Sequence, residues 1–224
     1  MPIKYKIITI DGPAGAGKST IAQGLARELD FAYVDTGALY RAVTWKVLQE
    51  KVSLEDQNEL NRLLQSFSVQ IEKEHYFVGD IDVTVALREQ DVTNWVSEVS
   101  AKKAVRDALL STQIDITKKE DTVFEGRDLG SVVFPNADVK FFLTASAEIR
   151  AKRRWKELQT ILPQSNLSLE EVLKNIKKRD QCDLHRTVAP LKRAPDAMLI
   201  DTSNLSIQEV IENMKIKINK KIKR

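Results

Sequence analysis

The sequence lacks most features that would mark a disulfide-linked, metal-clustered or membrane-embedded protein. Its 224 residues include one cysteine, Cys182, and two histidines, which excludes an intrachain disulfide and disfavours zinc sites built from cysteine or histidine. No stretch approaches the roughly 20 apolar residues of a membrane span, and the opening MPIKYKIITID lacks a signal-peptide core. We therefore expect a cytoplasmic protein with no membrane partner.

An excess of charge of one sign is also missing. The chain has 35 basic and 32 acidic residues, a net charge of +3, and its one basic run lies at residues 215–224. Nucleic-acid-binding proteins usually concentrate positive charge on one face, so the composition predicts no nucleic-acid partner. The 42% of hydrophobic residues suffices for a substantial core.

Strand-like and helix-like segments alternate along most of the chain. Short apolar runs typical of buried strands occur at residues 7–10, 31–34, 123–124, 139–143 and 198–200. Helical periodicity occurs at residues 19–29, 39–50, 53–64, 92–116 and 147–158, and after Ser-x-x-Glu capping boxes at Ser168 and Ser206. This order predicts an α/β fold, in which helices flank a parallel sheet and ligands bind at the carboxyl ends of its strands.

One segment departs from this alternation. Residues 67–87 contain short alternating runs broken by Gly79 and Asp80, a pattern that predicts a small antiparallel sheet. We therefore expect one domain, with a core of about residues 1–64 and 112–224 and an antiparallel-β/α insert of about residues 65–111.

A glycine-rich loop follows the first predicted strand. It matches G-x-x-x-x-G-K-[ST], and with the next residue it comprises Gly12, Pro13, Ala14, Gly15, Ala16, Gly17, Lys18, Ser19 and Thr20. In this motif backbone N–H groups surround phosphate oxygens, while Lys18 reaches the β- and γ-phosphates and Ser19 binds Mg²⁺. The loop lies between a strand and a helix, as the motif requires. The sequence thus predicts a phosphoryl-transfer enzyme that binds ATP, with Mg²⁺ as its cofactor.

Arginines and acids stand where an acceptor would bind. Arg41 follows the second strand and falls in the first turn of the predicted helix, and Arg127 and Asp128 follow the third strand. Arg179, Asp183 and Arg186 form a further cluster near the carboxyl end. Phosphoryl transfer depends on positioning and on cations around the moving group, and arginine pairs phosphate oxygens two at a time. No general base is evident, which favours an acceptor that is already a phosphate, as in nucleoside monophosphate kinases.

Four segments in this order give a more specific indication. The sequence contains ITIDGPAGAGKST, DTGALYRAV, EGRDLGSVVFPNADVKFFL and KRDQCDLHRTVAPL. Over nearly its whole length it resembles the bacterial cytidylate kinases. The resemblance implies transfer of the γ-phosphoryl of ATP to CMP or dCMP, an insert that binds the monophosphate, a mobile lid at about residues 159–187, and a monomer.

The resemblance also implies roles for individual residues. Lys18, Arg41, Arg127 and Arg186 would be the catalytic cations that meet phosphates. The residues that bind CMP would be Thr36 and Tyr40 in the monophosphate pocket; Ser97, Arg106 and Asp128 at the cytosine ring; Arg179 and Asp183 at the sugar; and the three arginines Arg41, Arg127 and Arg186. Arg153 would stack on adenine. The sequence departs from the family at Thr36, where relatives often have serine, and at residues 160–165, a lengthened stretch.

Two alternatives remain open at this stage. A phosphate-loop kinase could act on another acceptor, such as UMP, AMP or a small metabolite, and the trio Ser97, Arg106 and Asp128 would distinguish these. A nucleotide-gated binding protein could instead use the basic end of the chain on nucleic acid, which would make its binding steeply dependent on salt.

Overall fold

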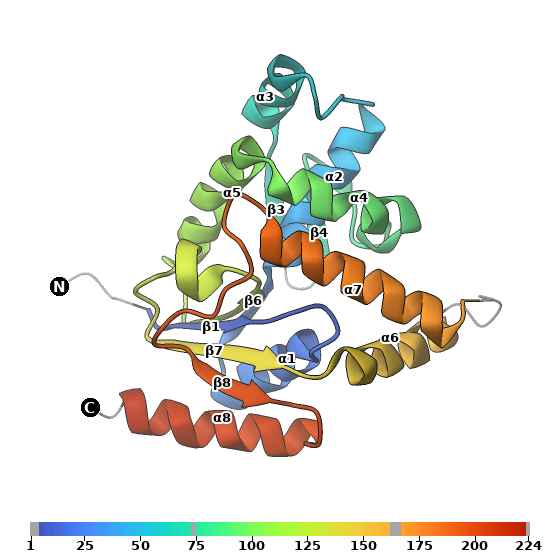
Figure 1. Ribbon diagram of the computed structural model, residues 1–224. Coiled ribbons are helices and arrows are strands. Elements are labelled where there is room, and N and C mark those ends of the chain that lie inside the picture. The colour runs from blue at the N-terminus through green and yellow to red at the C-terminus, as the bar shows by residue number, and fades with distance from the viewer. Residues whose placement is uncertain (1–4, 73–74, 162–166, 223–224) are drawn as a thin grey trace. The chain divides into compact units, whose positions relative to one another are not determined.

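The computed structural model describes residues 5–72, 75–161 and 167–222 (Figure 1). The chain forms two compact units, one made of residues 1–34 and 120–224 and the other of residues 35–119. The predicted insert, residues 65–111, lies within the second unit. Among the described helices, none is both long and apolar enough to cross a membrane.

The first unit is built on a parallel sheet, as predicted. Its strands are β1 (Ile7–Asp11), β2 (Ala32–Asp35), β6 (Thr122–Gly126), β7 (Val139–Thr144) and β8 (Met198–Asp201), in the order β2-β6-β1-β7-β8. Strand β1 lies between β6 and β7, with Ile8 opposite Val123 on one side and Val139 on the other. This central position explains why β1 is buried on both faces from Ile8 to Asp11.

Apolar helix faces cover this sheet. Helices α1 (Lys18–Leu29) and α8 (Ile207–Ile222) contribute Ile21, Leu25 and Met214 to the same buried cluster as Ile8 and Phe141 of the sheet. The segment after β6 forms one π-helical turn, η2 (Leu129–Val133). Because the sheet is parallel, the loops after β1 and β6 emerge at the same edge.

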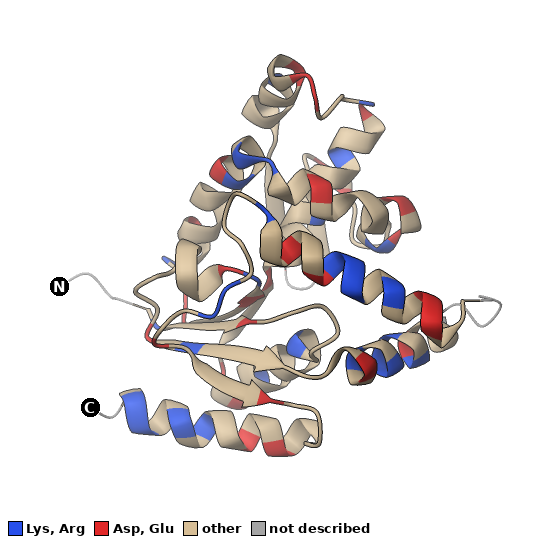
Figure 2. Ribbon diagram, viewed as in Figure 1, with Lys and Arg blue, Asp and Glu red and all other residues tan. Residues whose placement is uncertain are grey.

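Two further helices of this unit, α6 (Ala147–Ile161) and α7 (Leu169–His185), pack against each other (Figure 1). Their contact contains Ala151, Val172 and Ile176, while charges of both signs lie along the two helices (Figure 2). The predicted capping boxes are confirmed, since Ser168 caps α7 and Ser206 precedes α8 with the same reciprocal bonds. Residues 162–165 of the predicted lengthened stretch lie outside the described residues.

The second unit consists of helices and the predicted antiparallel sheet. Its elements are α2 (Thr36–Gln49), α3 (Gln57–Ser66), β3 (Val69–Glu72), β4 (His75–Val78), β5 (Ile81–Asp82), the short helix η1 (Ala86–Arg88), α4 (Gln90–Ala101) and α5 (Lys103–Ile116). Strand β4 pairs with β3 and β5, both antiparallel. The alternating pattern of residues 67–87 was therefore interpreted correctly.

Three helix boundaries in this unit differ from the prediction. Helix α2 begins at Thr36 because the Asp35 carboxylate accepts the Ala38 N–H, so Arg41 lies in the second turn and not in the first. Helix α3 begins at Gln57, after Asp56 caps it in the same way. The predicted helix 92–116 is two helices, which meet at Lys102 in an extended conformation.

Candidate phosphate-transfer site

The phosphate loop connects β1 to α1 and adopts a backbone that requires glycine. Gly12 has φ of +149° and Gly17, the residue before α1, has φ of +87°. A Cβ atom on Gly12 would lie 2.1 Å from the carbonyl oxygen of Leu143. Neither the torsion nor the space at position 12 therefore admits a side chain.

Three side chains, one from the loop itself and two from distant segments, bind carbonyl groups of this loop. Lys18 Nζ donates to the Pro13 carbonyl at 2.9 Å, and Arg150 Nη1 donates to the Ala14 carbonyl at 3.1 Å. Thr202, after β8, donates through Oγ1 to the Ala16 carbonyl at 3.1 Å. The loop is thus held in a fixed shape at the positive end of α1, the arrangement in which helix N-termini bind phosphate.

Lys18 is the buried cation of the site, with 6% of the residue exposed. Burial, together with the charges of Arg127 and Arg179, lowers its pKa to about 7, and the charges of Glu125 and Asp183 oppose this effect. Several cations are therefore close enough to disfavour one another. An anion bound among them would relieve their repulsion.

Ser19 and Glu125 bring two hard oxygen ligands together. The exposed Ser19 donates through Oγ to Oε1 of Glu125, a buried residue of β6, at 2.8 Å. A hydroxyl beside a carboxylate suits Mg²⁺, which binds proteins through one or two oxygen ligands and keeps waters and substrate phosphates for the rest. No cluster of three or more His, Cys, Asp or Glu side chains that could hold a metal occurs among the described residues. These residues fit Mg²⁺.

Two ion pairs join the segment after β6 to the end of α7. Arg127 Nε contacts Asp183 Oδ2 at 3.1 Å, and Arg186 Nη2 contacts Asp128 Oδ1 at 3.1 Å. The side chains of the second pair are 6% and 5% exposed. Both predicted phosphate-binding arginines of this unit therefore lie against carboxylates that the sequence placed at the CMP site.

The remaining predicted residues of the first unit lie in helices. Arg153, the predicted adenine-stacking residue, donates to the hydroxyl and the carbonyl of Thr202. Its neighbour Arg150 is buried and forms an ion pair with Asp180 at 2.8 Å. Thr20 is exposed in the first turn of α1.

The second unit holds the other predicted ligand residues. Arg41 Nη1 donates to the Leu87 carbonyl and to Thr93 Oγ1, and the Arg106 guanidinium lies 5.1 Å from the centre of the Tyr40 ring. Thr36 is buried in the first turn of α2. Ser97 is half-buried on α4, and its carbonyl accepts the hydroxyl of Ser100.

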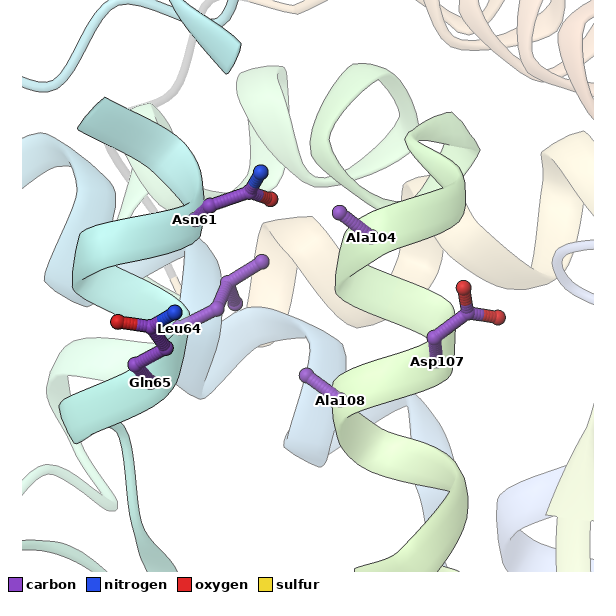
Figure 3. Close-up of a pocket in the computed structure, with 6 residues that line it drawn as sticks. All are labelled: Asn61, Leu64, Gln65, Ala104, Asp107 and Ala108. Carbon is purple, nitrogen blue, oxygen red and sulfur yellow. The ribbon is translucent and has the colours of Figure 1, made fainter. Parts of the chain in front are cut away.

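A cavity of about 340 Å³ also lies in this unit, between α3 and α5 (Figure 3). It is lined by Asn61, Leu64, Gln65, Ala104, Asp107 and Ala108. No predicted ligand residue lines it, and its single charged residue offers no cation to a phosphate. We therefore assign no part of the transfer reaction to it.

The sequence predicts the cations but assigns no role to four residues that contact the phosphate loop or the segments beside it. These are Asp11, Glu125, Arg150 and Thr202. Three of these residues could have been identified from their location at strand ends. Asp11, Glu125 and Thr202 lie at or next to the ends of strands β1, β6 and β8. Ligand sites of parallel sheets gather at these ends.

Comparison with known proteins gives a consistent result. A sequence model described as cytidylate kinase matches residues 8–220. The cytidylate kinase of Protochlamydia amoebophila is 46% identical over 202 residues, covering 88% of this chain and 89% of its own. That of Carboxydothermus hydrogenoformans is 47% identical over 199 residues, covering 87% and 89%.

Solved structures give the fold alone. The shikimate kinase of Bacteroides thetaiotaomicron aligns with a TM-score of 0.50 at 12% sequence identity, covering 96% of this chain and 98% of that one. At this identity the likeness supports the parallel-sheet kinase fold and says nothing of the acceptor.

Proposed function

The chain belongs to the cytidylate kinase family, and from that premise we propose that it transfers the γ-phosphoryl group of ATP to CMP or dCMP, giving ADP and CDP or dCDP. The observation that carries the proposal is the crowding of cations around Lys18, whose pKa falls to about 7 through burial and through the charges of Arg127 and Arg179. Such a site favours a polyanion, and two substrates bearing phosphates would supply one.

The phosphate groups would be bound by the loop and by four cations. In this proposal Gly12 to Thr20 hold the phosphates of ATP, and Lys18, Arg41, Arg127 and Arg186 stabilise the charge of the group in transfer. Arg153 would stack on the adenine ring. An acceptor phosphate is already an oxyanion, so the reaction requires no side chain to remove a proton from it.

The choice of acceptor would depend on residues that pair with the edge of the base. Arg106 and Ser97 can donate to the O2 and N3 acceptors of cytosine, and the Asp128 carboxylate can accept from its N4 amino group. Uracil has an acceptor in place of that amino group, so it would face the carboxylate unfavourably. Thr36 and Tyr40 would line the monophosphate pocket, and Arg179 and Asp183 would contact the sugar.

Mg²⁺ would be held by the Ser19 hydroxyl and the Glu125 carboxylate. When bound, it neutralises part of the charge on the phosphates of ATP. The predicted lid, about residues 159–187, would close over the nucleotides and exclude water, which limits wasteful hydrolysis of ATP. We expect the enzyme to work as a monomer in the cytoplasm, without nucleic acid.

A substrate panel tests this function. We would measure ADP release with ATP and Mg²⁺ in the presence of CMP, dCMP, UMP, AMP or GMP, and with no acceptor. We expect rapid turnover with CMP and dCMP and much slower turnover with the others. A preference for UMP or AMP would contradict the assigned acceptor, and absence of turnover with every acceptor would contradict the proposed function.

A further inference from the structure

Strand β1 ends in a buried carboxylate that has no assigned part in the transfer. Asp11 is 4% exposed and directly precedes Gly12 of the phosphate loop. Its Oδ1 accepts the backbone N–H of Leu129 at 2.9 Å, and its Oδ2 accepts that of Gly130 at 2.8 Å. Both oxygens of the side chain are therefore used to hold a second segment of the chain.

The two N–H groups belong to the first residues of the π-helical turn η2. The first N–H groups of any helical turn have no acceptor within that turn and need one from elsewhere. Asp11 supplies it from another strand. The turn also packs closely on the sheet, since a Cβ on Gly130 would lie 3.0 Å from Thr9 Oγ1 and 3.1 Å from Lys140 Cδ. Strand β1 thus fixes the position of η2.

Arg127 and Asp128 lie directly before this turn. Arg127 Nε contacts Asp183, and the Asp128 carboxylate accepts from Arg186, so the segment that Asp11 holds is joined to the end of α7. A continuous path of contacts therefore runs from Asp11, the residue before the phosphate loop, to Arg127 and Arg186, the two arginines that the proposed function assigns to phosphates. A shift of η2 would move Arg127 and Asp128 together.

Stability alone does not explain a carboxylate at this position. Burial raises the pKa of Asp11 to about 6, against the effect of the two N–H bonds, and the charge of Asp128 adds to the rise. An asparagine would avoid the cost of burying a charged group. It has a single acceptor oxygen, however, and its NH₂ group would face a second N–H donor. The need to accept from two adjacent amides accounts for aspartate.

We infer that Asp11 is a positioning residue that fixes the acceptor-side segment Arg127–Asp128 relative to the donor's phosphate loop. The inference rests on the proposed function, because it assigns Asp11 to the alignment of the two substrates. Asp11 touches neither substrate in this account. It acts through the backbone of Leu129 and Gly130.

The test compares Asp11→Asn with a control that removes another hydrogen bond of strand β1. Asp138 Oδ2 accepts the N–H of Ile7, at the other end of β1, at 2.8 Å, so Asp138→Ala also removes a carboxylate-to-backbone bond from this strand. For both variants and the wild type we would measure kcat, the KM for CMP, the ratio of CMP to UMP turnover, the Kd for ADP and Tm.

We expect Asp11→Asn to lower kcat/KM for CMP about 100-fold, because a misplacement of about 1 Å at the reacting groups costs that much. The preference for CMP over UMP should fall as well, since Asp128 moves, while the Kd for ADP stays within about threefold because the glycine loop keeps its other contacts. Asp138→Ala should lower Tm without changing kcat, the KM for CMP or the acceptor preference.

Other results would overturn the inference. If Asp11→Asn lowers Tm as Asp138→Ala does and leaves the KM for CMP and the acceptor preference unchanged, Asp11 is merely structural. A loss confined to ADP binding would place its role in the donor loop instead. If the asparagine variant does not fold, Asp11→Ser, which is smaller and can accept one bond, is measured against the same predictions. A wild type without CMP kinase activity removes the proposed function and this inference together.

Discussion

The phosphate loop and helix α7 both carry residues to which the proposed function assigns a role, but they are held in place by different forces. The loop depends on backbone geometry, because glycines take torsions that other residues avoid and side chains bind its carbonyls. Helix α7 is held by ion pairs that link its residues Asp180 and Asp183, and Arg186 directly after it, to Arg150, Arg127 and Asp128. An apolar cluster with α6 adds to these ion pairs.

The difference suggests which part can rearrange when substrates bind. If Arg127 and Arg186 bind phosphate as proposed, a phosphate would compete with Asp183 for Arg127 and with Asp128 for Arg186, since arginine pairs well with phosphate oxygens in bidentate geometry. In the loop only the bond from Lys18 to the Pro13 carbonyl would face this competition, whereas Arg150 and Thr202 would keep their bonds to the Ala14 and Ala16 carbonyls. We therefore expect the loop to keep its shape during the reaction and the ion pairs of α7 to exchange.

The largest expected effect comes from adding one methyl group to the loop. Gly12→Ala places a Cβ 2.1 Å from the Leu143 carbonyl oxygen, and the atoms that it meets belong to the Leu143 backbone, which cannot rotate away as a side chain could. We expect kcat/KM to fall at least about 1000-fold, since the loop must deform at the phosphates. Steady-state kinetics and the Kd for ADP would measure this.

A matched control separates torsional strain from the loss of the site. Gly79 also has positive φ, +58°, but a Cβ there would meet nothing within 4 Å. Gly79→Ala should lower stability by about 1 kcal/mol and leave activity unchanged. Normal activity in Gly12→Ala would show that the loop is not rigid and would break the comparison with α7.

The next effect concerns the attachment of α7. The side chains of Arg150 and Asp180 are 7% and 15% exposed, so Asp180→Asn leaves a buried charge without its counterion. Removing the counterion of a buried charge lowers the free energy of unfolding by about 3 kcal/mol. We expect urea unfolding to show a loss of this order, and hydrogen exchange to show that amides of α7 lose protection before those of β1.

The same two helices provide the control. Lys177 and Glu148 also join α7 to α6, at 3.9 Å, but their side chains are 58% and 61% exposed. Exposed pairs contribute little, so Lys177→Gln should leave unfolding and exchange unchanged. Equal effects of the two substitutions would mean that the apolar contact, and not the buried ion pair, holds α7.

Much of this organisation could be predicted from the sequence. The alternation of apolar runs gave the parallel sheet, the run of residues 67–87 gave the antiparallel one, and Ser168 and Ser206 marked two helix starts. The break at Lys102 could not be predicted, because neither proline nor glycine occurs there and the helical pattern continues through it. Asp35 and Asp56 cap α2 and α3, so these helices begin at residues that apolar periodicity alone does not predict.

The candidate site was predicted unevenly for a related reason. Motifs identify residues that must have one chemistry, such as Lys18 and Arg127. Arg150, Thr202 and Asp11 instead act on backbone atoms of segments that are distant in sequence, and such contacts leave no local pattern. Asp11 and Leu129, for example, are 118 positions apart and come together only because β1 and β6 are neighbours in the sheet.

The smallest expected effect lies at Lys18, where the loop and α7 influence the same charge. Burial and the charges of Arg127 and Arg179 lower the pKa of Lys18 to about 7, so above pH 7 the ligand-free protein increasingly holds a neutral lysine. A bound nucleotide favours the ammonium and must then draw a proton from solution. Affinity should therefore fall as pH rises, and for one proton the Kd for ADP should increase about fivefold between pH 7 and pH 8.

Calorimetry in buffers of different ionisation enthalpy would show proton uptake at pH 8. Lys18→Arg, whose guanidinium stays charged, should bind more weakly but with little change over this range. An equal pH dependence in both proteins would assign the titration to another group, and would leave the loop electrostatically independent of α7.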